Sequence, residues 1–251
     1  MTMTNIHGRI ESHVASWFKQ LEKSFKNVRK PRENKPFVTI SRESGAYGTT
    51  IADMLVEHLK KRERRRNAVW AVFDKELISK VIDENKFPEQ YNKYFSESSI
   101  STVQDIMGEL LDVSPPRETL VRKMGETIFH LAQLGYVILV GRGSNIITRR
   151  LPKGVHVRLV GSFEKRVAHM QEYLEIGEKD ARDYIIKEDL DRKEFIKQYF
   201  HKDINDASLY DIVINLDTVP IEDAVRIIGD LIFKNKGKLK KAIGARPSFF
   251  S

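Results

Sequence analysis

A glycine-containing segment, Ser41–Thr50, has the residue types of an anion-binding loop. Gly45 and Gly48 allow backbone N–H groups to turn toward an anion, and the positive end of a following helix would add to this attraction. The hydroxyl of Thr49 or Thr50 could then contact a phosphate or Mg²⁺. The segment lacks the lysine of the pattern G-x-x-x-x-G-K-[ST], so an ordinary strand–turn–helix connection is the alternative.

Two further segments place a charged side chain where a buried strand is expected to end. Asp74 follows the apolar residues 69–73, and its carboxylate could accept hydrogen bonds from a ligand or cap the next helix. Arg142 stands between two glycines after the apolar residues 136–140. An arginine in this setting has room to present its planar guanidinium to a phosphate. The alternative is a turn whose arginine faces solvent.

A charged segment, residues 187–197, is a candidate lid over these strand ends. Phosphoryl transfer needs cations close to the transferred oxygens and a site that is closed to water. Arg192 and Lys193 could supply such cations. The same segment would equally fit a solvent-exposed helix that is stabilised by its own ion pairs.

The elements that must position these segments are short apolar runs separated by helical periods. The expected strands are residues 37–40, 69–73, 136–140, 155–160 and 211–215. The expected helices lie near 51–59, 77–82, 120–134 and 163–174, in a charged stretch that runs to 200, and over 221–233. This alternation predicts an α/β fold with a doubly wound, five-stranded and mainly parallel sheet. Ligands of such sheets bind beyond the carboxyl ends of the strands, so the candidate residues should converge on one edge.

The surplus of basic residues lies at the two ends of the chain. The whole sequence carries 43 Lys and Arg against 35 Asp and Glu, a net charge of +8. Residues 1–36 contribute +5 and residues 234–251 contribute +6, so residues 37–233 are slightly acidic, at −3. A polyanionic partner of the whole protein is therefore not indicated, because the excess charge belongs to the ends.

Three parts of the chain follow from this distribution. We expect a basic amphipathic helix over residues 1–34, a single α/β domain over 35–233 and a basic flexible tail over 234–251. Within the domain, residues 85–116 would form a cap or insertion, and residues 178–200 would form the lid. We expect the N-terminal helix to dock on its own domain or to form a homo-oligomer. An anionic membrane or a nucleic acid is the less favoured partner of the basic ends.

The composition of the 251 residues excludes several classes of protein. The chain has no cysteine, which excludes disulfides, thiolate metal sites and cysteine nucleophiles. It contains no apolar run close to the ~18–20 residues of a membrane-spanning helix. Its first residues lack the apolar stretch of a signal peptide, so we expect a cytoplasmic protein.

Taken together, these segments resemble the cytidylate kinase-like family of P-loop nucleoside monophosphate kinases over about residues 37–233. The resemblance rests on residues 38–48, 73–78 and 140–143, on Glu164 and Arg166 after the strand at 155–160, and on residues 189–192 and 210–215. It implies a P-loop kinase-like three-layer α/β/α sandwich with a helical cap and a lid.

The resemblance also implies an activity, which is transfer of the γ-phosphoryl group of ATP to a nucleoside monophosphate, CMP or dCMP, with Mg²⁺. The donor phosphates would lie on the loop residues Arg42, Gly45, Ala46, Tyr47, Gly48, Thr49 and Thr50. Thr49 and Thr50 would assist Mg²⁺. Asp74 and Arg142 would face the acceptor nucleotide. Arg142, Arg192 and Lys193 would be the catalytic cations, because charge neutralisation supplies most of the catalysis.

Two positions depart from cytidylate kinases. The loop has no lysine, and Gly143 stands where those enzymes have an aspartate that contributes to cytosine recognition. Arg42, Lys75 or a cation of the lid would have to supply the missing positive charge. Two other functions therefore stay open, which are a non-catalytic nucleotide-binding or regulatory protein of the same fold and a polyanion-binding protein that acts through its basic ends.

Overall fold

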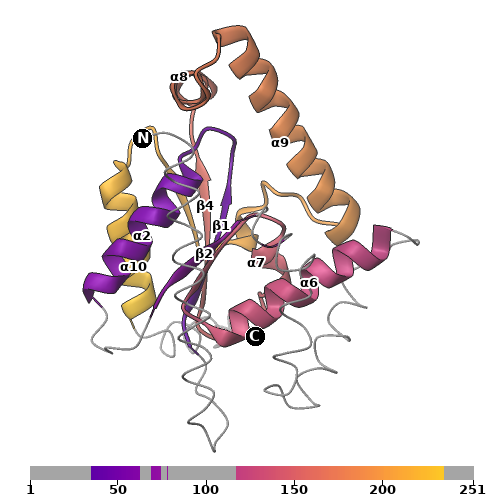
Figure 1. Ribbon diagram of the computed structural model, residues 1–251, viewed down its shortest axis with the longest axis vertical. Coiled ribbons are helices and arrows are strands. Elements are labelled where there is room, and N and C mark those ends of the chain that lie inside the picture. Colours follow the sequence, from indigo (N-terminus) through magenta and orange to yellow (C-terminus); the bar gives the residue numbers. More distant parts are fainter. Residues whose placement is uncertain (1–34, 63–68, 75–77, 79–116, 235–251) are drawn as a thin grey trace, which may run out of the picture.

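The computed structural model describes 35–62, 69–74, 78 and 117–234 of the chain (Figure 1). The expected N-terminal helix, the cap over 85–116 and the tail beyond residue 234 lie outside the described residues. The same holds for Lys75 and for most of the helix expected near 77–82.

A five-stranded sheet forms the centre of the domain, and all of its strand pairs are parallel. The strands are β1 Phe37–Arg42, β2 Ala71–Phe73, β3 Val137–Val140, β4 Gly154–Val160 and β5 Ile212–Asn215. Their spatial order is β2-β3-β1-β4-β5. Helices cover both faces, so the predicted α/β/α fold class is confirmed. Because β1 lies in the middle, its carboxyl end is flanked by the ends of β3 and β4.

Three strands are shorter than predicted: β2 and β3 begin two residues and one residue later than expected, and β5 begins at Ile212 instead of Asp211. Gly135 and Tyr136 adopt left-handed backbone conformations, with φ of 72° and 56°. The N–H of Tyr136 donates to the carbonyl of Pro36 at 2.7 Å, so regular pairing of β3 with β1 starts one residue later. The edge strand β2 pairs only with β3, beginning at Ala71. Regular pairing of β2 therefore begins where Ala71 lies opposite Val137, the first residue of β3.

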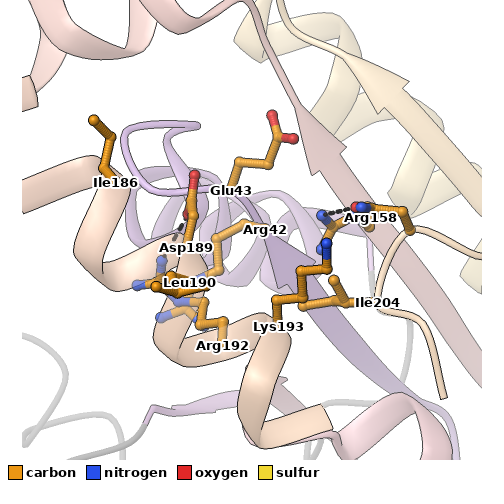
Figure 2. Close-up of a pocket in the computed structure, with 10 residues that line it drawn as sticks. Arg42, Glu43, Arg158, Ile186, Asp189, Leu190, Arg192, Lys193 and Ile204 are labelled. Carbon is orange, nitrogen blue, oxygen red and sulfur yellow. Dashed lines mark hydrogen bonds and ion pairs between the residues drawn. The ribbon is translucent and has the colours of Figure 1, made fainter. Parts of the chain in front are cut away.

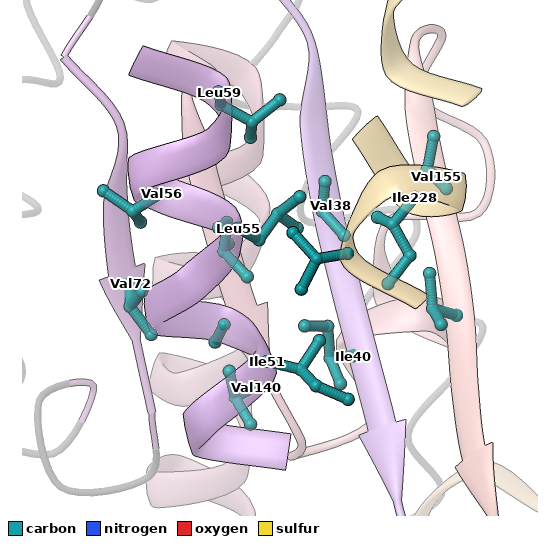
Figure 3. Close-up of a cluster of buried hydrophobic side chains, with 14 of the residues drawn as sticks. Val38, Ile40, Ile51, Leu55, Val56, Leu59, Val72, Val140, Val155 and Ile228 are labelled. Atoms are coloured by element: carbon teal, nitrogen blue, oxygen red, sulfur yellow. The ribbon is translucent and has the colours of Figure 1, made fainter. Parts of the chain in front are cut away.

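One face of the sheet is apolar and is covered by α2 Gly48–Arg62 and α10 Ile221–Phe233 (Figure 1). Val38 and Ile40 of β1 point to this face and pack with Leu55 of α2 and Ile228 of α10 (Figure 3). All four side chains are fully excluded from solvent. Each such burial is worth about 1.5–3 kcal/mol, so this layer supplies much of the stability that holds β1 in place.

The opposite face carries polar side chains among apolar ones. It is covered by α6 Arg117–Leu134, α7 Ser144–Ile147 and the C-terminal part of α9 Glu178–Phe200. Thr39 of β1 and His156 of β4 form a buried hydrogen bond of 2.9 Å. Two residues further along the same strands, Arg158 donates to the hydroxyl of Ser41 at 3.0 Å. This polar row leads to the carboxyl edge of the sheet.

Two helices, α8 Phe163–Leu174 and α9, extend beyond that edge (Figure 1). They pack on each other through Val167, Met170, Ala181 and Ile185. The segment expected to form a lid, residues 178–200, is the single continuous helix α9. None of the described helices is long and apolar enough to cross a membrane.

Candidate active site

The loop between β1 and α2 is held from outside by α8. Gly45 has a left-handed φ of 80°, and a Cβ at this position would lie 2.6 Å from the carbonyl oxygen of Arg166. The carbonyl of Gly45 accepts a hydrogen bond from His169 Nδ1 at 2.8 Å. The Tyr47 ring stacks on the His169 imidazole with centroids 3.6 Å apart. Glycine is therefore required at position 45 because the loop backbone lies directly against α8.

His169 acts as a neutral donor in this contact. A carbonyl oxygen only accepts hydrogen bonds, so Nδ1 of His169 must carry a proton. Burial lowers the pKa of His169, while the bond to Gly45 and the nearby Glu172 act in the opposite direction. The ring is therefore uncharged at neutral pH and adds no positive charge beside the loop.

Every backbone and side-chain polar group of Ser44 is bound by a side chain of α8 or α9. Its N–H donates to the carboxylate of Asp189 at 2.7 Å. Its hydroxyl accepts from Arg192 at 2.6 Å, and its carbonyl accepts from Arg166 at 2.9 Å. Ser44 is buried as a result. The backbone N–H of Ser44 thus already donates to a negatively charged group, the carboxylate of Asp189.

Carboxylates also neutralise the two arginines around Ser44. Arg166 donates to Asp189 at 2.6 Å, and Arg192 donates to the same carboxylate at 3.1 Å. A second N–H of Arg192 donates to Glu188 at 2.9 Å. Charge-assisted bonds of this kind are short and strong. They fix α9 against the loop, so the candidate lid is closed on it.

Arg42, the last residue of β1, crosses from this loop to the end of β3. A Cβ at Gly48 would lie 2.8 Å from Cγ of Arg42, and a Cβ at Gly141 would overlap with its guanidinium. Burial lowers the pKa of Arg42 to about 10, and repulsion by Arg192 is the next cause. The side chain therefore keeps its charge at neutral pH. Among the described residues it forms no hydrogen bond or ion pair.

Arg142 projects from an unusual turn at the end of β3. Its φ is 56°, and the glycines on either side have φ of 84° and 67°, so three consecutive residues are left-handed. The guanidinium lies 5.6 Å from the centroid of the Phe195 ring of α9. Burial lowers the pKa of Arg142, Glu188 raises it and Arg192 lowers it. These influences place Arg142 close to both charged residues of α9.

Gly143 has no room for a side chain. A Cβ at this position would lie 2.5 Å from the Phe200 ring at the end of α9, and the backbone is left-handed. An aspartate here would therefore displace Phe200, which is buried in the core. The packing of Phe200 of α9 against Gly143 thus leaves no room for the aspartate that cytidylate kinases have at this position.

Arg42, Arg142 and Arg192 converge at the carboxyl ends of β1 and β3. Arg192 lowers the pKa of both Arg42 and Arg142, and Arg142 also lowers that of Arg42, while Asp74 and Glu188 act against this repulsion. Asp74 lies half-buried at the end of β2. A cluster of partly buried guanidinium groups is suited to binding phosphate oxygens and to stabilising charge that develops on them.

The other predicted residues lie in the loop, in α2 and in α9. Ala46 is buried in the loop, and Thr49 and Thr50 lie half-buried in the first turn of α2. Lys193 of α9 lines a pocket together with Arg42 and Arg192.

This pocket has a volume of about 340 Å³ and lies between the ends of β1 and β4 and the helix α9 (Figure 2). Its lining residues are Arg42, Glu43, Arg158, Ile186, Asp189, Leu190, Arg192, Lys193, Ile204 and Asn205. The sequence reasoning did not select Arg158, Glu188 or Asn205. A signal for Arg158 existed, because a charged residue within the apolar run 155–160 needs a specific partner.

A comparison with protein families agrees with this geometry. Residues 37–218 match the model of the cytidylate kinase-like family. The chain belongs to this family. The predicted resemblance is therefore confirmed over most of the domain, including the loop, the turn at Arg142 and the whole of α9. No curated protein matches this member of the family.

Solved structures match this chain at low sequence identity. An uncharacterized protein from Eubacterium ventriosum is 20% identical with a TM-score of 0.59, and the match covers 80% of this chain and 100% of that one. Shikimate kinase from Bacteroides thetaiotaomicron is 16% identical with a TM-score of 0.42, covering 79% and 98%. Shikimate kinase from Acinetobacter baumannii in complex with shikimate is 16% identical with a TM-score of 0.40, covering 81% and 96%.

Proposed function

We propose that this member of the cytidylate kinase-like family transfers the γ-phosphoryl group of ATP to a nucleoside monophosphate, CMP or dCMP. The observation that carries the proposal is the convergence of Arg42, Arg142 and Arg192 at the sheet edge. Arg42 and Arg142 form no ion pair among the described residues, so their charges are available to a ligand. Phosphoryl transfer depends mainly on positioning and on neutralising charge, which is what such a cluster provides.

The donor phosphates would lie on the loop between Arg42 and Thr50. The Ser44 N–H already donates to a carboxylate oxygen of α9 at 2.7 Å. A phosphate oxygen in the place of this carboxylate oxygen would accept the same hydrogen bond. Arg42 would replace the missing loop lysine. Its guanidinium is charged at neutral pH, with a pKa of about 10, and it lies between the loop and the turn at Arg142.

Mg²⁺ would bind with the donor nucleotide at the start of α2. This ion commonly uses one or two protein oxygens and takes its other ligands from phosphates and water. The hydroxyls of Thr49 and Thr50 and the carboxylate of Asp74 are oxygen donors of the required kind at this edge. Among the described residues, no group of three or more His, Asp or Glu could hold a metal ion. When bound, Mg²⁺ would neutralise charge on the donor phosphates.

The acceptor phosphate would lie against Arg142. The left-handed turn and the Phe195 ring hold this guanidinium in one place, and Asp74 would contact the acceptor from the end of β2. Gly143 offers no side chain to the base, so base selection would come from residues other than the one that cytidylate kinases use.

The test is Mg²⁺-dependent formation of ADP from ATP in the presence of each nucleoside monophosphate. We expect turnover with CMP or dCMP, and a loss of at least about 100-fold in Arg142→Ala, the scale of removing one stabilising group from a transition state. Arg226→Ala is the matched control, because Arg226 is exposed and pairs only with Asp223 on its own helix. Absence of turnover with the whole panel would contradict the proposal.

A non-catalytic nucleotide-binding role is the second candidate, and one contact favours it. Asp189 holds the Ser44 N–H, so a donor phosphate reaches the amide only if Asp189 moves away. Calorimetry would separate the two functions. Binding of ATP or CMP without any ADP formation would support the second candidate, and ADP formation would eliminate it.

A further inference from the structure

The pocket beside α9 contains a buried arginine that has no counter-ion. Arg158 of β4 is only 5% exposed. It donates to the hydroxyl of Ser41 at 3.0 Å and to the side-chain oxygen of Asn205 at 3.1 Å. None of the ion pairs of the described residues includes Arg158. A buried charge without a partner of opposite sign is costly, so its presence at the wall of a pocket needs an explanation.

The guanidinium of Arg158 is held in one orientation. Its centre lies 5.8 Å from the centroid of the Tyr210 ring. The Tyr210 hydroxyl donates to the carbonyl of Ile204 at 2.8 Å, which fixes the ring. Arginine has five N–H donors in a rigid plane, and the two hydrogen bonds to Ser41 and Asn205 leave others for a ligand. Such fixed groups bind anions with little loss of conformational entropy.

A second cation faces Arg158 across the pocket. Lys193 of α9 is exposed, and its side chain extends toward Arg158 (Figure 2). It also forms no ion pair with a described residue. Two positive groups that face each other repel in the empty pocket, and an anion placed between them would be attracted by both.

The outer wall of the same pocket is apolar. Ile186 and Leu190 of α9 are 58% and 51% exposed, which is unusual for side chains of this size. They lie one turn apart on α9, and both line the pocket with Ile204. A ligand with one anionic group and an uncharged body would therefore satisfy both walls. The volume of about 340 Å³ fits a small metabolite.

We propose that Arg158 and Lys193 bind the phosphate or carboxylate group of a small organic anion in this pocket. The site adjoins the cluster of Arg42, Arg142 and Arg192 and shares Arg42 and Arg192 with it, because both of these arginines also line the pocket. The bound molecule would lie next to the phosphoryl-transfer site. The inference does not depend on which reaction takes place there.

The test is calorimetric titration of the full chain with three probes, inorganic phosphate, CMP and D-glycerate, without ATP. We expect at least one probe to bind, and Lys193→Gln to weaken its binding by about tenfold, as for the loss of one charge-assisted hydrogen bond. Lys123→Gln should bind like the wild type, because Lys123 is an exposed lysine on α6, away from the pocket. Arg158→Lys keeps the charge but loses the planar fork, and should weaken binding further.

The probes distinguish the source of the anionic group. Binding of phosphate and CMP but not of D-glycerate, weakened in Lys193→Gln, would support a phosphate ligand of the pocket. Binding of D-glycerate that is weakened in the same variant would support a carboxylate ligand. Failure of all three probes to bind at millimolar concentration would overturn the inference, as would unchanged binding in both Lys193→Gln and Arg158→Lys. Because Lys193 is exposed, its variant should fold, and thermal melting checks Arg158→Lys. ADP formation is not part of the readout, so failure here leaves the proposed kinase activity standing.

Discussion

Five arginines lie at one edge of the sheet, but they fall into two groups. Arg166 and Arg192 are paired with carboxylates, at 2.6 Å to Asp189 and 2.9 Å to Glu188. Arg42, Arg142 and Arg158 form no ion pair among the described residues. The paired group joins the loop to α8 and α9, and Arg192 in addition belongs to the cluster with Arg42 and Arg142. The unpaired group carries charges that the fold itself does not use, which is the condition for binding a ligand anion.

The largest expected effect comes from removing an unpaired charge. Arg42→Met keeps an apolar chain against Gly48 but removes the cation. We expect ATP-dependent turnover with CMP to fall by at least about 100-fold, or about 3 kcal/mol of transition-state stabilisation. The melting temperature should stay the same or rise, because a buried unpaired charge is removed. Arg42→Lys, which keeps the charge, should retain more activity. A marked fall in melting temperature would place Arg42 in the structural group.

Removal of a paired arginine should instead lower the stability of the fold. Arg166→Met removes the donor to Oδ2 of Asp189 and the donor to the Ser44 carbonyl. We expect the free energy of unfolding to fall by about 2 kcal/mol, as measured by urea denaturation. The exposed control Arg226→Met should change it by less than about 0.5 kcal/mol. If the free energy of unfolding of Arg166→Met is unchanged, the paired arginines do not stabilise the fold as we expect.

Asp189, the carboxylate that binds both paired arginines, gives a further test. Asp189→Asn keeps an oxygen for the Ser44 N–H but removes the negative charge that competes with phosphate. We expect ATP to bind about tenfold more tightly, or about 1.4 kcal/mol, as measured by calorimetry. Weaker binding would instead show that Asp189 serves the ligand by holding Arg166 and Arg192 in place.

The smallest effect concerns pH. Burial lowers the pKa of His169, so the unfolded chain takes up this proton at a higher pH than the folded protein does. The contribution to stability is complete above pH of about 6.5 and is lost as the pH falls toward the folded-state pKa. Urea denaturation at pH 7.5 and pH 5.5 should show a smaller loss in His169→Gln than in the wild type. An equal loss in both proteins would exclude His169 as the source.

Local sequence patterns sufficed for the framework and for part of the site. Alternating apolar runs predicted the parallel sheet, and the glycines around Arg142 marked it as a residue of the strand end. The contact between Ser44 and Asp189 joins residues 145 positions apart. No local pattern encodes such a contact, because it depends on how α8 and α9 return to the loop.

Arg192 and Lys193 show a second reason why the sequence did not predict the whole site. The two residues are adjacent in the sequence, which predicts the same role for both, that of a cation close to the transferred phosphoryl group. Adjacent residues on an α-helix point about 100° apart, so Arg192 reaches the Ser44 hydroxyl while Lys193 extends toward Arg158. The place of Arg158 in the pocket could not be predicted from the sequence for a related reason. Alternation along β4 puts it on the face of His156, but only the packing of α9 creates a pocket there.

The central place of β1 has a consequence for how the chain folds. Phe37 pairs with Val137 on one side and with Gly154 on the other, so both neighbours are about 100 residues later in the chain. Loop closure over such distances is entropically costly, and proteins rich in distant contacts fold slowly. During synthesis, β1 and the loop after it leave the ribosome long before either partner strand. The loop after β1 is therefore made well before the strands beside which it takes its final shape.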